Sequence, residues 1–322
     1  MKKLLIFAAV CISMTAQATI LRVSNLTNSG APYSSISDAM SAAMDGDTIM
    51  VDGSSTSYGD ITIDRKIVLM GPGYWLAENG VNTEGSAAAT VGAVTLSDNA
   101  AGTTICGMWV SGQMTIDAPN VVVNRCHTYY IRIAAAATNC VFHQNFMYTT
   151  TTGQIISGKS DSEYAVNTQI TNNIIIQENT GNFPTSPVVY LNEAYIANNT
   201  FAYFNMNNYG TKTGIASCTN CTIEKNVGGS LGNISGCTYV DNCTYDSWIY
   251  TTRTSDLTIK DQELDTTIAE EIAAKNAGAF NGDDPYVISG VPAGPMIQDI
   301  TVPASVQQGS SLNVTIKLGI QR

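Results

Sequence analysis

Cysteine and histidine are the side chains in this sequence that could bind a metal or form a disulfide. Cys218 and Cys221 have the C-x-x-C spacing of a metal-ligand pair, but no second pair and no histidine accompanies them. The two histidines, His127 and His143, lie near copies of a short repeat, at positions that should face different sides of the fold. We expect both to be structural or solvent-facing. The sequence therefore predicts neither a metal site nor a bound cofactor.

Charged side chains that could catalyse cleavage of a sugar chain are few. Hydrolysis of a glycosidic bond needs two carboxyl groups at a set separation, and the adjacent Asp283 and Asp284 lie in the C-terminal part of the chain, outside the repeats. A lyase would need a base and a group that neutralises the substrate carboxylate. Arg132 and Lys159 are the candidates for the second role, and no aspartate cluster for calcium accompanies them. These residues leave open whether the chain is an enzyme.

The elements that must position these residues are indicated by a repeated motif: an apolar residue, two variable residues, Asn, then another apolar residue. Its Asn residues are Asn145, Asn173, Asn199, Asn226 and Asn242, and Arg125 takes the Asn place in an earlier copy. The spacing varies while the motif stays fixed, which is typical of a β-solenoid whose loops differ in length. Asn tolerates the left-handed conformation of a tight turn, and its amide can bond to the next coil. We therefore expect these residues to form a ladder.

The same repeat accounts for most of the cysteines. Cys140, Cys221 and Cys237 come two residues before the motif, while Cys126 and Cys243 come just after its marker residue. These positions predict stacked interior residues that act as small hydrophobes. A disulfide between neighbouring coils is the alternative.

The N-terminus has the pattern of a secretory signal peptide. Lys2 and Lys3 precede a short apolar run that ends before Ala16-Gln17-Ala18, which predicts cleavage after Ala18. Lipid attachment at Cys11 is the alternative. The predicted location is secreted, periplasmic or at the cell surface. No later window is apolar enough to cross a membrane, so we expect no membrane insertion.

The charge of the predicted mature chain disfavours some partners. Loss of Lys2 and Lys3 leaves 13 basic and 26 acidic residues, a formal charge of 13 − 26 = −13. Nucleic acid and anionic membrane surfaces need a basic footprint, so neither is an expected partner.

Two short helices and a final pair of strands are also expected. Ser35 and Asp38 have capping-box spacing at the start of an amphipathic stretch, which predicts a helix over about 35–44. Alternating apolar residues over 48–69 predict strands, and eight or nine coils should follow. A second helix is expected over 265–277. Residues 297–317 are interpreted as two strands that cover the open end of the stack.

The order Ser35-Ile36-Ser37-Asp38-Ala39-Met40, Gly46-Asp47-Thr48-Ile49, Ile61-Thr62-Ile63 and Ile67-Val68-Leu69-Met70-Gly71 resembles the N-terminal cap and first coil of the pectate lyase-like right-handed β-helix superfamily. The tail, with Gly278-Ala279-Phe280 and Asp284-Pro285-Tyr286, resembles the ends of secreted Gram-negative β-helix proteins without assigned activity. The resemblance implies an all-β, right-handed parallel β-helix with an N-terminal capping helix and a C-terminal strand extension. The expected organisation is a signal peptide at 1–18, the β-helix at 19–260 and a C-terminal capping segment at 261–322.

The resemblance also implies which sheet would hold a ligand, since enzymes of this superfamily bind their substrate along one parallel sheet. The strand before each motif copy should form that sheet. Alternation then turns five of its side chains outward: Thr115, Arg132, Tyr190, Asn192 and Asn233. An aromatic surface nearby is added by Tyr129, Tyr130, Tyr148 and Tyr203. Such groups suit a neutral or weakly charged sugar chain. The alternative is that this stripe only keeps the sheet soluble.

Three functions remain open from the sequence. The leading hypothesis is a polysaccharide-associated protein that binds glycan without catalysis. The alternatives are a polysaccharide lyase that acts by β-elimination, and an adhesin or structural surface protein. Charged groups that converge in a cleft would favour the lyase, whereas a flat, uncharged sheet would favour the other two. The oligomeric state is not indicated.

Overall fold

The computed structural model describes residues 18–80, 87–149, 153–178, 186–204, 213–244, 256–260, 264–301, 311 and 314–321. The predicted signal peptide, except for its last residue Ala18, lies outside these ranges.

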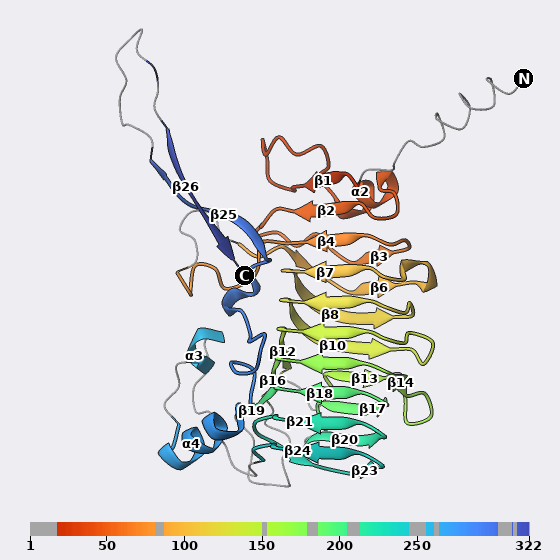
Figure 1. The fold of residues 1–322 in the computed structure, drawn as a ribbon. Coiled ribbons are helices and arrows are strands. Elements are labelled where there is room, and N and C mark those ends of the chain that lie inside the picture. The colour runs from red at the N-terminus through yellow and green to blue at the C-terminus, as the bar shows by residue number, and fades with distance from the viewer. Residues whose placement is uncertain are drawn as a thin grey trace, which may run out of the picture.

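Most of the described chain forms parallel strands that stack into two long sheets (Figure 1). The first sheet has ten strands. In spatial order they are β1 (Ile20–Val23), β2 (Thr48–Val51), β4 (Val68–Met70), β7 (Thr104–Cys106), β9 (Val122–Asn124), β11 (Val141–His143), β15 (Gln169–Thr171), β18 (Tyr195–Ala197), β21 (Thr222–Glu224) and β24 (Thr238–Val240). Nine of these strands follow the first helix, and at one strand per coil this number agrees with the expected eight or nine coils.

The second sheet has fourteen strands and is branched. Its members are β3 (Ile61–Ile63), β5 (Thr90–Val91), β6 (Val94–Leu96), β8 (Trp109–Ile116), β10 (His127–Ile133), β12 (Phe146–Thr149), β13 (Ile156–Gly158), β14 (Ala165–Val166), β16 (Ile174–Glu178), β17 (Val188–Asn192), β19 (Thr200–Phe204), β20 (Thr213–Thr219), β22 (Ser230–Leu231) and β23 (Ile234–Ser235). The first part of β10 pairs with β12, and its last part pairs with β13, so the sheet divides there. These stacked parallel strands are compatible with the predicted β-helix.

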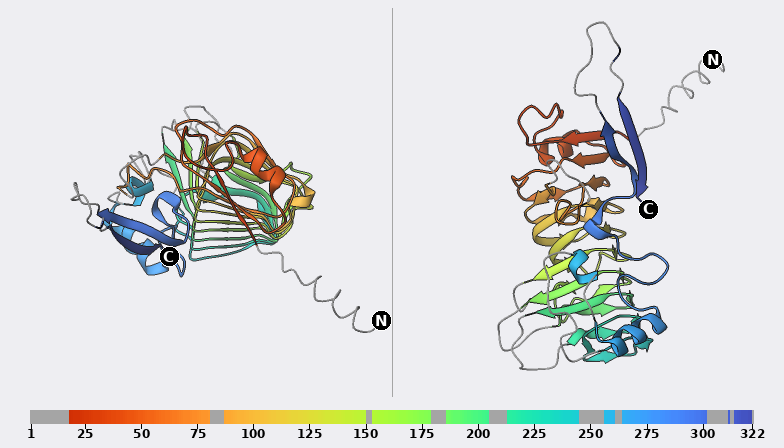
Figure 2. Two further views of the ribbon diagram at one scale, coloured as in Figure 1. Left: turned by 90° about the horizontal axis from the view of Figure 1, so that it is seen from above. Right: turned by 90° about the vertical axis from the view of Figure 1, so that its left-hand side faces the viewer.

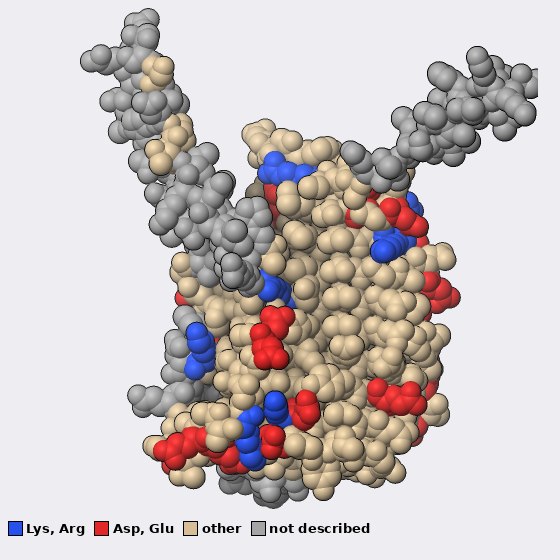
Figure 3. Space-filling model, in the orientation of Figure 1, with Lys and Arg blue, Asp and Glu red and all other residues tan. Residues whose placement is uncertain are grey.

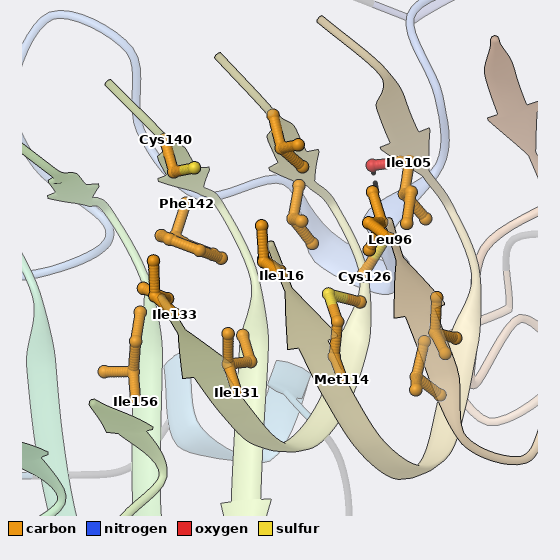
Figure 4. Packing of buried hydrophobic residues seen from close by; sticks show 14 of the residues in the cluster. Leu96, Ile105, Met114, Ile116, Cys126, Ile131, Ile133, Cys140, Phe142 and Ile156 are labelled. Atoms are coloured by element: carbon orange, nitrogen blue, oxygen red, sulfur yellow. Dashed lines mark hydrogen bonds between the residues drawn. The ribbon is translucent and has the colours of Figure 1, made fainter. Parts of the chain in front are cut away.

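Alternation along each short strand builds the core. In the ten-stranded sheet the middle residues face inward and line up in register. From β1 to β21 they are Leu21, Ile49, Leu69, Ile105, Val123, Phe142, Ile170, Ile196 and Ile223, all buried. Figure 4 shows part of this core, where Phe142 and Cys140 of one sheet face Ile133 and Ile156 of the other. Each fully buried Leu or Ile contributes roughly 1.5–3 kcal/mol, so the stack gains stability with every coil.

The first helix, α2 (Ile36–Ala42), confirms the expected start at Ser35. The Ser35 hydroxyl accepts a hydrogen bond from the Asp38 N–H at 3.1 Å. Ile36, Ala39 and Met40 are buried against β1, β2 and β3. The helix ends two residues earlier than expected because Ala43 is already extended.

The C-terminal part begins with α3 (Asp256–Lys260) and α4 (Thr266–Lys275). The second of these confirms the helix expected over 265–277, with Asp265 as its N-cap. Two short 3₁₀ turns, η1 (Asp98–Ala100) and η2 (Ile288–Gly290), complete the helical elements of the described residues. No helix within the described ranges is long and apolar enough to cross a membrane.

The last strands, β25 (Gly294–Thr301) and β26 (Thr315–Gln321), form the expected antiparallel pair. Their expected place was wrong. They lie beside the β1–β7 end of the stack rather than over the open end at β24 (Figures 1 and 2). The physical reason is a second core: residues 277–292 pack along the outer side of β12, β16 and β19 and carry the chain back toward the first coils.

Candidate functional site

Five Asn side chains stack in one column, which is buried from Asn145 to Asn226 and half-buried at Asn242. From Asn173 onward, each Oδ1 accepts the backbone N–H of the Asn on the preceding coil, at 2.8 Å from Asn145 to Asn173 and at 3.0 Å for the three following steps. Each Nδ2 from Asn145 to Asn242 donates to the carbonyl of the inward-facing middle residue of the ten-stranded sheet on the preceding coil. The column therefore runs through Asn145, Asn173, Asn199, Asn226 and Asn242 without a gap.

The left-handed turn lies one residue earlier than the sequence suggested. Gln144, Asn172 and Asn198, not the ladder residues, have φ between 53° and 56°. Arg125 shares this left-handed conformation, with φ 53°, and follows Asn124, which pairs with His143. Cys126, whose N–H donates to Asn145 Oδ1 at 2.9 Å, therefore occupies the Asn place of the first copy. Assigning that place to Arg125 was wrong, because the ladder needs an extended residue just after the turn.

Arg132, Thr115 and Tyr130 lie together on the outer side of β8 and β10. Arg132 pairs with Thr115 across the two strands, and its guanidinium lies 6.0 Å from the centre of the Tyr130 ring. Arg132 Nη1 donates to the carbonyls of Ile131 and Gln154 at 3.1 and 3.0 Å. Burial lowers the pKa of this guanidinium, while Tyr130 opposes that effect. No Asp or Glu of the described residues forms an ion pair with Arg132.

The other predicted residues have different surroundings. Lys159 forms an ion pair with Asp117 at 2.6 Å. The Asn192 Oδ1 accepts hydrogen bonds from Thr219 Oγ1 at 2.8 Å and Asn220 Nδ2 at 3.1 Å. Both side chains are thus engaged with neighbours within the stack.

Tyr190 does not continue the row of Arg132, so the alternation argument failed there. The register runs from Arg132 through Ser157 to Val189. Tyr190 has φ 57°, and its ring faces Tyr164 with centroids 5.8 Å apart. A left-handed residue interrupts the pleat, so the residues on its two sides no longer predict its direction.

A larger aromatic face on the first halves of β8, β10 and β12 contains Tyr129 and Tyr148, which were expected as aromatic surface, while its other members, Trp75, Trp109, His127 and Phe146, were not predicted. Trp109 stacks on His127 with ring centroids 4.4 Å apart, and Trp75 packs edge-on against Phe146 at 4.5 Å. Its half-buried members include Trp75 and Trp109. The sequence contains a signal for this face, because the residues just after the ladder place, His127 and Phe146, are aromatic in two successive coils.

A second polar group joins the C-terminal segment to the stack. His143 contacts Thr171 Oγ1 through Nδ1 at 2.8 Å and Asp284 Oδ2 through Nε2 at 3.0 Å. Gln144 Nε2 donates to Asp284 Oδ1 at 2.9 Å, and Gln144 Oε1 accepts from Arg125 Nε at 2.8 Å. Burial lowers the pKa of His143, although Asp284 opposes this. This group lies beside the ten-stranded sheet, whereas Arg132 is on the other one.

The outer face of the ten-stranded sheet is almost uncharged. From β2 to β18, none of its outward residues is Lys, Arg, Asp or Glu, and these are Thr48, Met50, Val68, Met70, Thr104, Cys106, Val122, Asn124, Val141, His143, Gln169, Thr171, Tyr195 and Ala197. Figure 3 shows this plain surface, with most charged side chains at its margins. A hollow of about 620 Å³ lies instead at the last coil, lined by Leu231, Ile234 and Tyr239 among others. It contains none of the predicted binding residues.

The chemical groups of the described residues do not assemble into a metal centre: no three His, Cys, Asp or Glu side chains of those residues are placed to hold an ion. The cysteines of the same ranges are all free thiols. Cys140 and Cys221 are buried, and Cys237 is partly exposed.

Comparison of the chain with known protein families, with curated proteins and with solved structures finds no match.

Proposed function

We propose that the chain is a right-handed parallel β-helix of the pectate lyase-like type, with α2 closing its first coil. The support is the stack of parallel strands in register and the buried side of α2 against β1, β2 and β3. The resemblance at the N-terminus favours the same fold. This architecture supplies long, flat outer faces on which a chain-like ligand can lie.

Its function, in this proposal, is to bind a polysaccharide outside the inner membrane without cleaving it. The observation that carries the proposal is the Arg132 guanidinium, half-buried beside Tyr130 and Thr115, with no carboxylate partner among the described residues. A half-buried cation without a counter-ion favours an anion in its neighbourhood, and guanidinium matches the geometry of a carboxylate. Tyr130 offers part of a ring and Thr115 a hydroxyl. A sugar chain with scattered acidic units fits these three groups.

The arrangement of charges favours binding over catalysis. A lyase would need a base close to the group that neutralises the substrate carboxylate, as general base catalysis requires hydrogen-bond reach. His143 and Asp284 lie beside one sheet and Arg132 lies on the other. The lyase therefore remains the alternative, and so does an adhesin or structural protein that binds no sugar.

The test is a binding screen of the purified protein against neutral and uronate-containing polysaccharides, with assay for newly formed unsaturated sugar ends. The Arg132→Ala variant should lose about 10- to 100-fold in affinity for the acidic chains, equal to roughly 1.5–3 kcal/mol for a charge-assisted hydrogen bond. The Arg65→Ala variant is the matched control, because it removes another half-buried Arg, which pairs with Asp64 away from the Arg132 face. Its binding should equal that of the unmodified protein.

Three results would overturn the proposal. Release of unsaturated products would establish the lyase. Binding of no polysaccharide by the unmodified protein would favour the adhesin or structural protein, and equal binding by both variants would remove the role of the Arg132 face.

A further inference from the structure

Three cysteines meet at the last two coils of the stack. Cys218 is the second-last residue of β20, Cys221 follows in the turn, and Cys237 directly precedes β24. The Cys221 N–H contacts Cys237 Sγ at 3.3 Å, and the Cys237 thiol lies 3.6 Å from the Cys218 carbonyl oxygen. The proposed sugar-binding face does not use any of them.

The register places Cys221 and Cys237 side by side. Thr222 pairs with Thr238, so the residues just before them occupy equivalent places on adjacent coils. Neighbouring strands lie about 4.8 Å apart. This spacing falls within the range of roughly 4.4–6.8 Å between Cα atoms that a disulfide accepts.

The two thiols differ in access and in reactivity. Cys237 is partly exposed on the last coil, while Cys221 on the coil before it is buried. The Cys218 thiol lowers the pKa of Cys221 by hydrogen bonding to its sulfur, and the same bond raises the pKa of Cys218. Burial raises the pKa of Cys237, so this thiol reacts first because it is accessible, and Cys221, which ionises more readily, is suited to the resolving role.

We propose that Cys221 and Cys237 are a disulfide-forming pair that locks the last coil to the coil before it. A low-molecular-weight disulfide, such as oxidised glutathione, is the oxidant. The Cys237 thiolate attacks one of its sulfurs, the S–S bond breaks, and one small thiolate leaves. The Cys221 thiolate then attacks Cys237 Sγ, so that the protein disulfide forms and the second small thiolate leaves. Two cysteine thiols are oxidised, their protons pass to solvent or to the leaving thiolates, and the small disulfide is reduced.

The experiment is to equilibrate the folded, fully reduced chain with oxidised glutathione, quench it in acid, denature it in the presence of an alkylating agent that caps the remaining thiols, and digest it with trypsin. Cleavage after Lys212, Lys225 and Arg253 separates Cys221 from Cys237. The expected result is the loss of two free thiols and a cross-link between peptides 213–225 and 226–253.

Single variants identify the pair, because each peptide contains a second cysteine. Cys218→Ala and Cys243→Ala are the matched controls and should retain the cross-link. Cys221→Ala and Cys237→Ala should each lose it. Cys237 is partly exposed, so its variant should keep a native circular dichroism spectrum even if the Cys221 variant does not.

Two outcomes would overturn the inference. One is that the chain without substitutions keeps all its thiols, or that its reaction stops at a glutathione adduct on Cys237. The other is a cross-link that persists in the Cys221→Ala variant, since Cys218 would then be the partner. Neither outcome depends on whether the protein binds sugar.

Discussion

An amide inside a hydrophobic stack is stabilising only when all its hydrogen-bonding groups are used, and Asn173 meets this condition. Its Oδ1 accepts from the N–H and the Nδ2 of Asn145 at 2.8 and 3.0 Å, and its Nδ2 donates to the carbonyl of Phe142 and to Asn199 Oδ1, each at 2.9 Å. Buried networks of this kind are costly when broken, because every group left behind lacks water. The ladder therefore fixes the register between coils.

The first prediction concerns this residue. Asn173→Ala should lower the free energy of unfolding by about 3 kcal/mol, because the buried Asn145 N–H and Phe142 carbonyl lose this partner and the Asn145 amide loses one of its two bonds. Denaturation with urea would measure the change. The control is Gln169→Ala on the same coil, an exposed side chain whose loss should change stability by less than about 0.5 kcal/mol. Equal losses in both variants would contradict the role of the ladder.

Single residues were predictable where a spacing repeats and unpredictable where the backbone leaves the extended region. The Asn positions and the buried positions of Cys140, Cys221 and Cys243 follow from the motif alone, whereas Cys126 occupies the ladder place instead of the place after it. Tyr190 and the turn residue of each coil do not, since a left-handed residue shifts the face of its neighbours without changing the apolar pattern. Asp117 was missed as the partner of Lys159 because the two are 42 residues apart.

At the scale of elements, a buried carboxylate fastens the C-terminal segment to the stack. Asp256 of α3 accepts hydrogen bonds from the Tyr286 hydroxyl at 2.9 Å, the Ser289 N–H at 2.6 Å and Asn79 Nδ2 at 2.5 Å. The hydroxyls of Tyr74 and Tyr286 are also hydrogen-bonded to each other. Burial raises the pKa of both tyrosines, so both stay protonated and able to donate.

The second prediction removes this anchor. Asp256→Ala should cost about 3 kcal/mol, because the buried Tyr286 hydroxyl and Ser289 N–H lose this acceptor and Asn79 Nδ2 loses one of its two, and Tyr286→Phe should cost about 1 kcal/mol. Limited proteolysis of residues 256–292 should become faster in the same order. Glu270→Ala on the exposed side of α4 is the control and should leave proteolysis unchanged. An Asp256 variant as resistant as this control would show that the second core alone holds the segment.

The third prediction concerns pH. The pKa of His143 is lowered in the folded chain, mainly by burial, so the folded state binds this proton less readily than the unfolded state. Its contribution is therefore fully present above the unfolded pKa of about 6.5 and is lost as pH falls through the folded pKa. Asp284 and Arg125 act on the same ring with opposite signs. Hydrogen exchange of residues 277–292, corrected for the intrinsic effect of pH, should become faster as the pH falls from about 7 to about 5.

His143→Gln tests the assignment, because glutamine keeps polar contacts and does not titrate in this range. Its exchange rates, corrected for the intrinsic effect of pH, should be flat over the same interval. A pH profile like that of the unmodified protein would point to another titrating group.

Elements with local sequence signals were predictable, but the surface against which the C-terminal segment packs was not. Capping residues located α2 and α4 to within two residues at their ends. The return of residues 277–292 along the outer side of β12, β16 and β19 depends on contacts with Phe146, Ile174 and Tyr74, which are distant in the sequence. An apolar run in the tail has the same sequence pattern whether it covers the end of a stack or its side.

At the scale of the molecule, the stack is a rod whose two ends differ. The β24 end leaves Tyr239 64% exposed in the row of inward residues, while the β1 end has α2 packed against its strands. The flat, nearly uncharged sheet between the ends follows from a composition with few charged residues and many Asn, Thr and Ser. The sequence left open whether this face would be flat and uncharged, whereas alternation predicted that Arg132 lies outward on the sheet formed by the strands before the motif.

The final prediction concerns the start of the rod. The Thr19 N–H donates to Asp47 Oδ1 at 2.7 Å, and the Met44 N–H donates to Asp47 Oδ2 at 2.8 Å. These two hydrogen bonds lower the pKa of Asp47, and the bond from the Met44 N–H has the larger effect. Cleavage after Ala18 would convert the Thr19 amide into an ammonium group and the hydrogen bond into an ion pair. We therefore expect mass spectrometry of the exported chain to find Thr19 at its N-terminus, whereas a lipid on Cys11 would refute the cleavage site.

The ion pair itself can be measured in a chain that starts at Thr19. Such a chain should be more stable than its N-terminally acetylated form by up to about 1 kcal/mol, the range of a surface ion pair. Asp47→Asn should abolish the difference. Since the folded pKa of Asp47 is lowered, the advantage should be present above the unfolded value of about 3.9 and disappear as pH falls through the folded one. It should also vanish above about pH 8, where the ammonium loses its proton, and an advantage that persisted at pH 10 would show that the hydrogen bond acts without the charge.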